Sequence, residues 1–300
     1  MKNLLTLCCC VAATAAGIWG CVPQMNGSSG DVQKNVQLHY QLGISYLSEG
    51  KTPQAVKELL AAQALAPSNA DIEHAVGLAY QQKGLYDKAV EQYQKALKLE
   101  PKLTEARNNL GTAYLAKGQY DEAITQFEKC LKDPLYSTPD KAAYNIGVAY
   151  FKKKDLDKAI ENYEKAVKLK EDNTSALYNL AFCLQEKKSY ANALECYKKV
   201  VSLDPTFKEA YYRMGLIYED QQDYHKALIS LDKACETDPD YMDAYFHAGR
   251  ILAKTGEVDN ALKKLQIVAK AEPESAIGKQ AREMIGHLNV KHLSARRSGG

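Results

Sequence analysis

A glycine returns at a fixed interval along most of this chain. The interval is 34 residues, and it lengthens to 36 between Gly111 and Gly147. The recurring residues are Gly43, Gly77, Gly111, Gly147, Gly215 and Gly249, and Ala181 fills the one gap. Alanine lies twelve residues after each, at Ala55, Ala89, Ala123, Ala159, Ala193, Ala227 and Ala261. Self-similarity at such a period is typical of solenoids, in which each unit packs only against its neighbours.

The residue pattern of each unit resembles that of the tetratricopeptide repeat, a helical hairpin with the pattern L-G-x2-Y…A-x3-F…P. A stretch such as "LGTAYLAKGQYDEAITQFEKCL" matches it closely. We therefore predict an all-α fold, a right-handed superhelical solenoid of about seven such hairpins with a C-terminal cap helix. The predicted repeats are 36–69, 70–103, 104–139, 140–173, 174–207, 208–241 and 242–275, followed by the cap helix.

Each element of the pattern has a physical reason. Glycine and alanine let the two helices of a hairpin cross closely, and a large residue further along the second helix fills the space beside the crossing. The turns "KGLYDKA" and "KGQYDEA" supply a glycine and then Asp87 or Asp121, which we expect to cap the second helix. Proline ends the hairpin because it has no N–H to continue the helix.

The first twenty residues have the features of an export signal. Lys2 precedes an apolar stretch, Leu4 to Ile18, that is too short to span a membrane. The stretch ends in "IWGC", which resembles a bacterial lipobox, and that resemblance implies acylation of Cys21. Val22 follows instead of the aspartate that signals inner-membrane retention, so we expect an outer-membrane lipid anchor facing the periplasm. The alternative is an ordinary secretory signal with an incidental cysteine.

The predicted domain organisation follows from these features. Residues 1–20 form the signal peptide, 21–34 an acylated flexible tether, 35–290 the solenoid and 291–300 a basic tail. Four cysteines remain after Cys21, and all occupy apolar helix positions. A Cys183–Cys196 disulfide within one hairpin is left open, because export permits disulfides.

The composition and motifs exclude several classes of function. The formal net charge is +2, which is no footprint for nucleic acid. No phosphate-binding loop, nucleophile elbow or metalloprotease motif occurs, and the histidines are scattered without ligand spacing. Acidic pairs such as Glu219-Asp220 have the pattern of solvated helix surface. We therefore expect no catalytic residues, no metal and no cofactor.

Function in a solenoid is expected on the long concave surface, which the first helix of each hairpin lines. Aromatic residues stand at five of the seven fifth positions of these helices. The candidate groove residues, at the fifth and ninth positions, are Tyr40, Ile44, His74, Leu78, Asn108, Tyr144, Val148, Tyr178, Phe182, Tyr212, Leu216 and Phe246. One interpretation is an aromatic channel for an extended or helical peptide. The other is that these rings pack between adjacent repeats.

The lengthened junction "DPLYSTPD", residues 133–140, interrupts the period. Its prolines predict an early end to the preceding helix and an extended connection. Three motifs follow one another here: Asn108-Asn109-x-Gly111, then Asp133-x-Leu135-Tyr136 in the lengthened junction, then Asn145-x-Gly147. In this arrangement the chain resembles the type IV pilus biogenesis lipoproteins of the PilF/PilW family. The alternative is a tolerated loop insertion.

The resemblance implies a non-enzymatic, pilotin-like role, in which the chain binds an outer-membrane secretin and helps it to assemble. A second hypothesis is a periplasmic adaptor for another envelope complex, such as cell-wall or polysaccharide export machinery. In both, the partner is a protein or peptide segment, and the membrane is contacted through the lipid anchor. An enzyme or enzyme-associated subunit is the third, which the missing motifs disfavour.

Overall fold

The computed structural model describes residues 29–298, with side chains over 30–290, and this part of the chain is built from α-helices. The helices are α1 Ser29–Ser48, α2 Thr52–Leu65, α3 Ala70–Gln82, α4 Tyr86–Leu99, α5 Thr104–Ala116, α6 Tyr120–Leu131, α7 Pro139–Lys152, α8 Leu156–Leu169, α9 Thr174–Glu186, α10 Tyr190–Leu203, α11 Lys208–Asp220, α12 Tyr224–Thr237, α13 Met242–Thr255, α14 Val258–Ala271 and α15 Ala276–Ser298. The predicted all-α class is confirmed.

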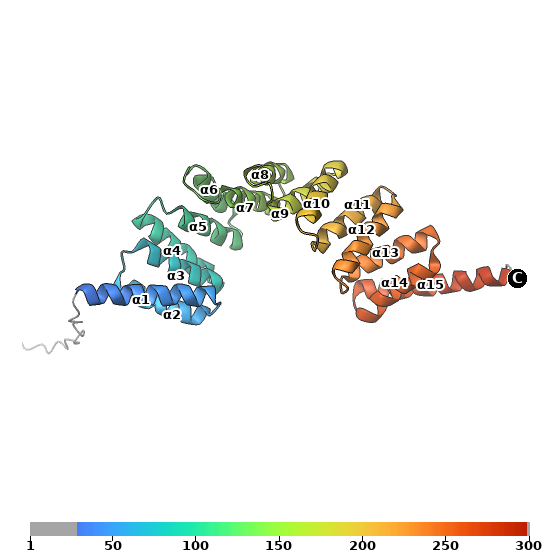
Figure 1. Ribbon diagram of the computed structural model, residues 1–300, viewed down its shortest axis with the longest axis horizontal. Coiled ribbons are helices and arrows are strands. Elements are labelled where there is room, and N and C mark those ends of the chain that lie inside the picture. Colours follow the sequence, from blue (N-terminus) through green and yellow to red (C-terminus); the bar gives the residue numbers. More distant parts are fainter. Residues whose placement is uncertain (1–28, 299–300) are drawn as a thin grey trace, which may run out of the picture.

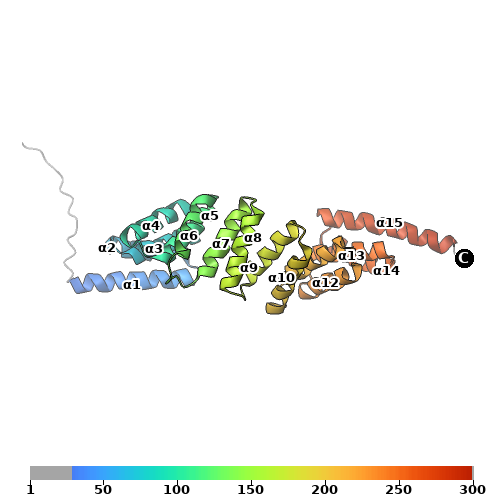
Figure 2. The ribbon, with the colours of Figure 1, turned by 90° about the horizontal axis from the view of Figure 1, so that it is seen from above.

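The helices form seven consecutive hairpins, each an odd-numbered helix followed by an even-numbered one, and α15 packs on the last hairpin. In one view the hairpins follow an arch, with α7 and α8 near its top (Figure 1). Seen from above, the same stack is elongated, with α1 and α15 toward opposite ends (Figure 2). Because contacts join neighbouring hairpins, the fold is the predicted solenoid.

Each glycine of the repeat faces one large side chain of the second helix, which leaves no room for a Cβ atom. A Cβ added to Gly147 would lie 2.6 Å from the ring of Tyr163, and one added to Gly111 would lie 2.6 Å from the ring of Phe127. Both rings are buried. The large residue of the second helix thus occupies the space over the glycine itself, which is closer packing than the sequence analysis assumed.

The turn inside each hairpin passes through the left-handed backbone region. Glycine supplies this conformation in four hairpins, at Gly50, Gly84, Gly118 and Gly256. In the other three, Lys154, Lys188 and Gln222 adopt φ values of 63°, 59° and 62°. The backbone of a residue other than glycine is strained in this region, so these three turns are less stable than the same turns with glycine would be.

The capping role expected of Asp87 and Asp121 is wrong. Neither residue caps its helix; both stand in the first helical turn, and the preceding N-cap residues make no side-chain bond. Asp87 instead forms a 2.7 Å ion pair with Lys117 of the next hairpin, and Asp121 pairs with Lys153. The carboxylates therefore join successive hairpins.

Both ends of the solenoid extend beyond the predicted limits. α1 begins at Ser29, so the last part of the predicted tether is helical, because Val32 and Val36 pack on the core of the first hairpin. The backbone of α15 continues to Ser298 and includes most of the predicted basic tail. The signal peptide and Cys21 lie outside the described residues.

The lengthened junction contains the ordinary repeat ending followed by an insertion. The Tyr136 N–H donates to the Asp133 carbonyl over 3.2 Å, and Phe207 makes the same bond to Asp204 over 3.2 Å. Leu135 N–H donates to the Asp133 side chain, as Thr206 does to that of Asp204. "DPLY" therefore has the role of "DPTF" in a later repeat. Ser137 and Thr138 are then added before α7, which starts on Pro139.

The four cysteines of the described residues are free thiols. Cys130, Cys183 and Cys235 are buried, and burial raises the pKa of the Cys130 thiol to about 12 and that of Cys183 to about 11. They act as small apolar core residues. Within residues 29–298, no helix has both the length and the apolar character needed to cross a membrane.

Candidate protein-binding groove

On α1, α3, α7, α9 and α11 the predicted groove residues form pairs one helical turn apart, and both members of a pair share a helix face. Asn108 on α5 and Phe246 on α13 stand alone. Most are half-buried; Ile44 is exposed and Phe246 is buried. Ile44 and Leu78 come together with Leu47 and Tyr86 at the edge of a pocket of about 650 Å³ near the N-terminal end. Tyr144 and Val148 pack against the cluster that contains Tyr163, and Tyr178 packs against the cluster that contains Tyr197.

The groove aromatics also support the core. The ring of Tyr144 lies 5.7 Å from that of Tyr163 in the same hairpin. Tyr178 lies 5.7 Å from Tyr197 and 5.0 Å from Phe207, the last residue of the repeat, just before α11. Burial raises the pKa of Tyr144, although a hydrogen bond from Asn179 opposes the shift. These rings therefore pack within and between repeats, as the second interpretation expects, while their remaining surface is open.

A row of hydrogen bonds joins neighbouring odd-numbered helices beside these rings. The Asn109 side chain donates to His74 Nε2 over 2.8 Å, and Asn179 donates to the Tyr144 hydroxyl over 3.0 Å. Gln81 donates to the Thr112 hydroxyl over 3.1 Å. The side-chain oxygen of Asn108, Oδ1, is buried without a protein hydrogen-bond partner. These polar groups fix the spacing of the odd-numbered helices. They also determine where polar side chains can hydrogen-bond to a ligand.

A small, mainly apolar hollow lies between α7 and α9, beside Tyr163 of α8. It has a volume of about 220 Å³ and is lined by Phe151, Tyr163, Tyr178, Asn179, Phe182 and Cys183. Phe151 meets Phe182 edge to face at 5.7 Å, and the guanidinium carbon of Arg213 lies 4.6 Å from the centre of the Phe182 ring. The hollow can take one apolar or aromatic side chain, with a cation at its rim.

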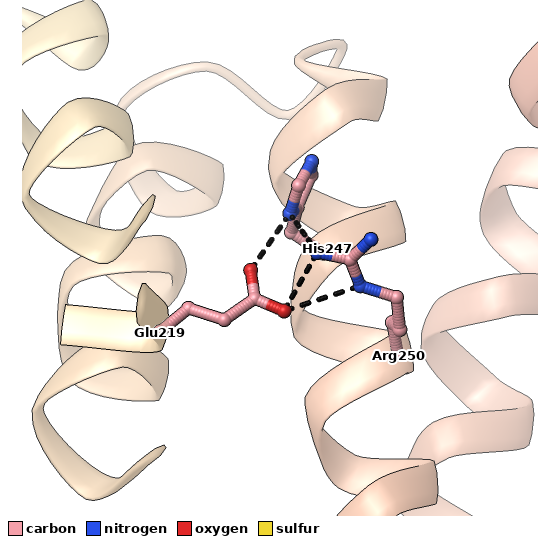
Figure 3. Close-up of polar contacts among 3 residues, drawn as sticks. All are labelled: Glu219, His247 and Arg250. Carbon is pink, nitrogen blue, oxygen red and sulfur yellow. Dashed lines mark hydrogen bonds and ion pairs between the residues drawn. The ribbon is translucent and has the colours of Figure 1, made fainter. Parts of the chain in front are cut away.

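Glu219, which the sequence analysis assigned to solvated surface, binds two residues of the next hairpin. Its carboxylate lies 2.6 Å from an Arg250 nitrogen and 3.0 Å from His247 Nδ1, so it joins α11 to α13 (Figure 3). Burial alone would raise the pKa of Glu219, but the bonds from His247 and Arg250 outweigh it and hold the pKa below its ordinary value. The cluster bridges two repeats near the C-terminal end.

The chain matches tetratricopeptide repeat family profiles over residues 77–118, 104–133, 147–188, 174–207, 209–241 and 243–275. These matches span more than half of the sequence. The chain belongs to the tetratricopeptide repeat family. Repeats of this family indicate a protein–protein interaction scaffold.

Solved structures of similar shape include other repeat proteins. Pseudomonas aeruginosa PilF is 20% identical with a TM-score of 0.57, over 85% of this chain and 99% of PilF. YrrB, described as having an unusual peptide-binding site, is 27% identical with a TM-score of 0.51, over 62% and 95%. The C-terminal part of a repeat protein from Cytophaga hutchinsonii is 17% identical with a TM-score of 0.68, over 81% and 98%. Curated proteins give no match.

The three junction residues of this repeat protein have different surroundings. The Asp133 carboxylate accepts a hydrogen bond from Thr104, and Tyr136 is buried in the core. Leu135 is 90% exposed. Together with Lys102 and Arg107 the junction lines a hollow of about 750 Å³. Of the three, Leu135 is the residue available to a partner.

Sequence reasoning missed several groove residues. Arg213, Asn109 and Asn179 all stand at the sixth position of their repeats; Arg213 lies over the Phe182 ring, and the two asparagines carry the hydrogen bonds. A signal was present in the sequence: asparagine recurs at 109, 145 and 179 in equivalent places. Among the described residues, no cluster of His, Cys, Asp or Glu is arranged to hold a metal ion.

Proposed function

We propose that this chain is a non-catalytic scaffold that holds a segment of a partner protein along the odd-numbered helices. The observation that carries the proposal is the hollow between α7 and α9, with Phe182 in its wall and Arg213 beside that ring. An apolar or aromatic side chain of the partner fills the hollow, and aromatic anchors of this kind contribute most to such interfaces.

The chemistry of the rim selects the residues beside that anchor. The Arg213 guanidinium favours an acidic side chain or a carboxylate next to the anchor. Asn179 lies in the same wall and already donates to Tyr144, so its carbonyl oxygen is free to accept a backbone N–H of the segment. The preferred ligand is thus an extended segment with an apolar residue followed or preceded by an acid.

We further propose that the scaffold is anchored by acylated Cys21 to the outer membrane and acts as a pilotin-like factor for a type IV pilus secretin. Support comes from the "IWGC" sequence and from the junction at Asp133, Leu135 and Tyr136. The likeness to PilF adds a shared fold. A periplasmic adaptor for cell-wall or polysaccharide export machinery remains the second candidate, since the groove itself specifies only a peptide.

The test is co-purification of the secretin with the full-length chain from native membranes. Phe182→Ala combined with Arg213→Glu should abolish secretin recovery, whereas Leu203→Ala, at an exposed leucine at the end of α10, should leave it unchanged. Recovery of other envelope proteins in place of the secretin would reject the pilus role and favour the adaptor. Equal recovery of the secretin by both variants would reject the groove as the binding surface.

A further inference from the structure

The lengthened junction and the turn before α5 line a hollow of about 750 Å³, which we call the junction hollow. Its lining comes from two connections, residues 100–103 between α4 and α5 and residues 132–138 between α6 and α7, and from the helix ends beside them. Each connection leads into an odd-numbered helix, so both lie at the same edge of the solenoid. The junction hollow shares no lining residue with the hollow between α7 and α9. It is therefore a separate site.

Cations outnumber carboxylates in the lining of the junction hollow. The four cations are Lys102, Arg107, Lys129 and Lys132, and the two carboxylates are Glu105 and Asp133. Within residues 30–290, none of the four cations forms an ion pair. The Asp133 carboxylate is already engaged, because it accepts hydrogen bonds from the Thr104 hydroxyl and from the Leu135 N–H. The junction hollow therefore carries an excess of positive charge that its own carboxylates do not neutralise.

Lys129 lacks the acid that pairs with its counterpart in the preceding hairpin. Lys95 occupies the same repeat position and lies 2.8 Å from Glu91, one helical turn earlier. The residue one turn before Lys129 is Thr125, whose hydroxyl donates to the Asp121 carbonyl instead. The ammonium group of Lys129 is therefore left to bind a ligand.

Arg107 is the one cation of the junction hollow that is half-buried, whereas the three lysines are exposed. Its guanidinium donates to the Pro101 carbonyl, which holds the side chain in place, and its other N–H groups are left to bind an anion. A carboxylate matches the planar fork of these donors and can accept two parallel hydrogen bonds. The chemistry of the junction hollow therefore favours a carboxylate at Arg107, with further acids near the lysines.

Leu135 adds an apolar requirement to the same site. Its side chain is 90% exposed in the lining of the junction hollow, while the next residue, Tyr136, is buried in the core and holds the loop in place. An apolar group of a ligand that packs on Leu135 removes apolar surface from water, which is favourable. A ligand that fits the whole lining therefore has several negative charges and an apolar group beside them.

We propose that the junction hollow binds an acidic segment of a partner protein, with one carboxylate on Arg107 and an apolar side chain on Leu135. Charge complementarity favours this occupant, because an acidic segment carries negative charges on successive residues and can meet all four cations. A lipid headgroup offers a single phosphate, and the flat surface of a bilayer does not enter a hollow. The site is distinct from the groove of the proposed function, so either can fail while the other holds.

The first test is the binding of a dye-labelled peptide, made of glutamates around one leucine, to the full-length chain in mild detergent. Fluorescence anisotropy at low salt measures it. Lys129→Glu with Lys132→Glu should weaken binding by about tenfold or more, because like charges then meet in the junction hollow. The matched control is Lys165→Glu with Lys168→Glu, at exposed lysines in the same repeat positions on α8, and it should change binding by less than about twofold. A peptide that does not bind the wild type, or equal weakening by both variants, would overturn the proposal.

A second set of measurements tests the apolar contact and the class of ligand. Leu135→Ser should weaken binding by about threefold or more. A peptide with serine in place of its leucine should lose the same affinity for the wild type and no further affinity for the variant. Glycerol phosphate, the charged part of a simple phospholipid, should not displace the peptide at matched ionic strength. Displacement by glycerol phosphate, or a Leu135→Ser variant that binds as tightly as the wild type, would contradict the proposal.

Discussion

At the scale of single residues, stability depends on side chains that stand where the backbone prefers glycine. Lys154, Lys188 and Gln222 adopt positive φ in turns where other hairpins have glycine. The glycines at 111 and 147 are needed for a different reason, since a Cβ there would strike Phe127 or Tyr163. The sequence distinguishes the two kinds of glycine only through their position in the repeat.

We expect Gln222→Gly to stabilise the protein by about 0.5–1 kcal/mol, because glycine relieves the left-handed strain at that turn. The adjacent Gln221→Gly is the matched control. Gln221 has a φ of −78°, so glycine there relieves nothing and should be neutral or destabilising. Urea denaturation measures both; a destabilised Gln222→Gly would show that its side chain contributes more than its backbone costs.

The Glu219 cluster predicts a pH dependence of stability. The pKa of the Glu219 carboxyl is lower in the folded state than in the unfolded state. The stabilising contribution of Glu219 is therefore complete above its unfolded-state pKa, and it is lost as the pH falls through its folded-state pKa. Glu219→Gln should therefore cost about 1 kcal/mol at pH 7, and this difference should shrink between about pH 5 and pH 3. A pH-independent difference would mean that packing, and not charge, joins α11 to α13.

At the scale of elements, the hairpins and their order could be predicted because the period and the residue pattern recur along the chain, with one longer interval and Ala181 in place of one glycine. The side-chain contacts between successive hairpins could not be predicted from the sequence. Asp87 occupies a helix start, where capping is the common role, yet it pairs with Lys117 in the next hairpin. Glu219 has the sequence of solvated surface, and its partners His247 and Arg250 come from the following repeat. Each of these contacts depends on how far one hairpin is rotated against the next.

The 36-residue interval is an element-scale question that the structure answers. Since "DPLY" makes the ordinary repeat ending and Pro139 can start α7, deletion of Ser137 and Thr138 should leave the helices intact. We expect a change in unfolding free energy within about 1 kcal/mol, which circular dichroism and thermal melting would measure. Loss of helix in the deletion variant would mean that the insertion is required for the packing of α7 on α6.

At the scale of the whole molecule, a solenoid whose contacts join neighbouring hairpins should lose stability locally. Truncation after Glu274 removes α15, whose Ala281 is buried with Leu265, Val268 and Phe246. Amide exchange in α13 and α14 should quicken, with a local loss of about 3 kcal/mol, while α1 to α4 keep their protection. A uniform loss across all hairpins would show that the arch unfolds as one unit.

At this scale the central proposal is that the partner binds along the odd-numbered helices, at the hollow beside Phe182. A photo-reactive amino acid placed at Phe182 in the full-length chain, and separately at Leu203 as control, would be activated in native membranes. We expect position 182 to cross-link to one partner protein through a segment with an apolar residue beside an acid, and position 203 not to cross-link. Cross-linking from position 203 but not from 182 would contradict the groove as the binding surface.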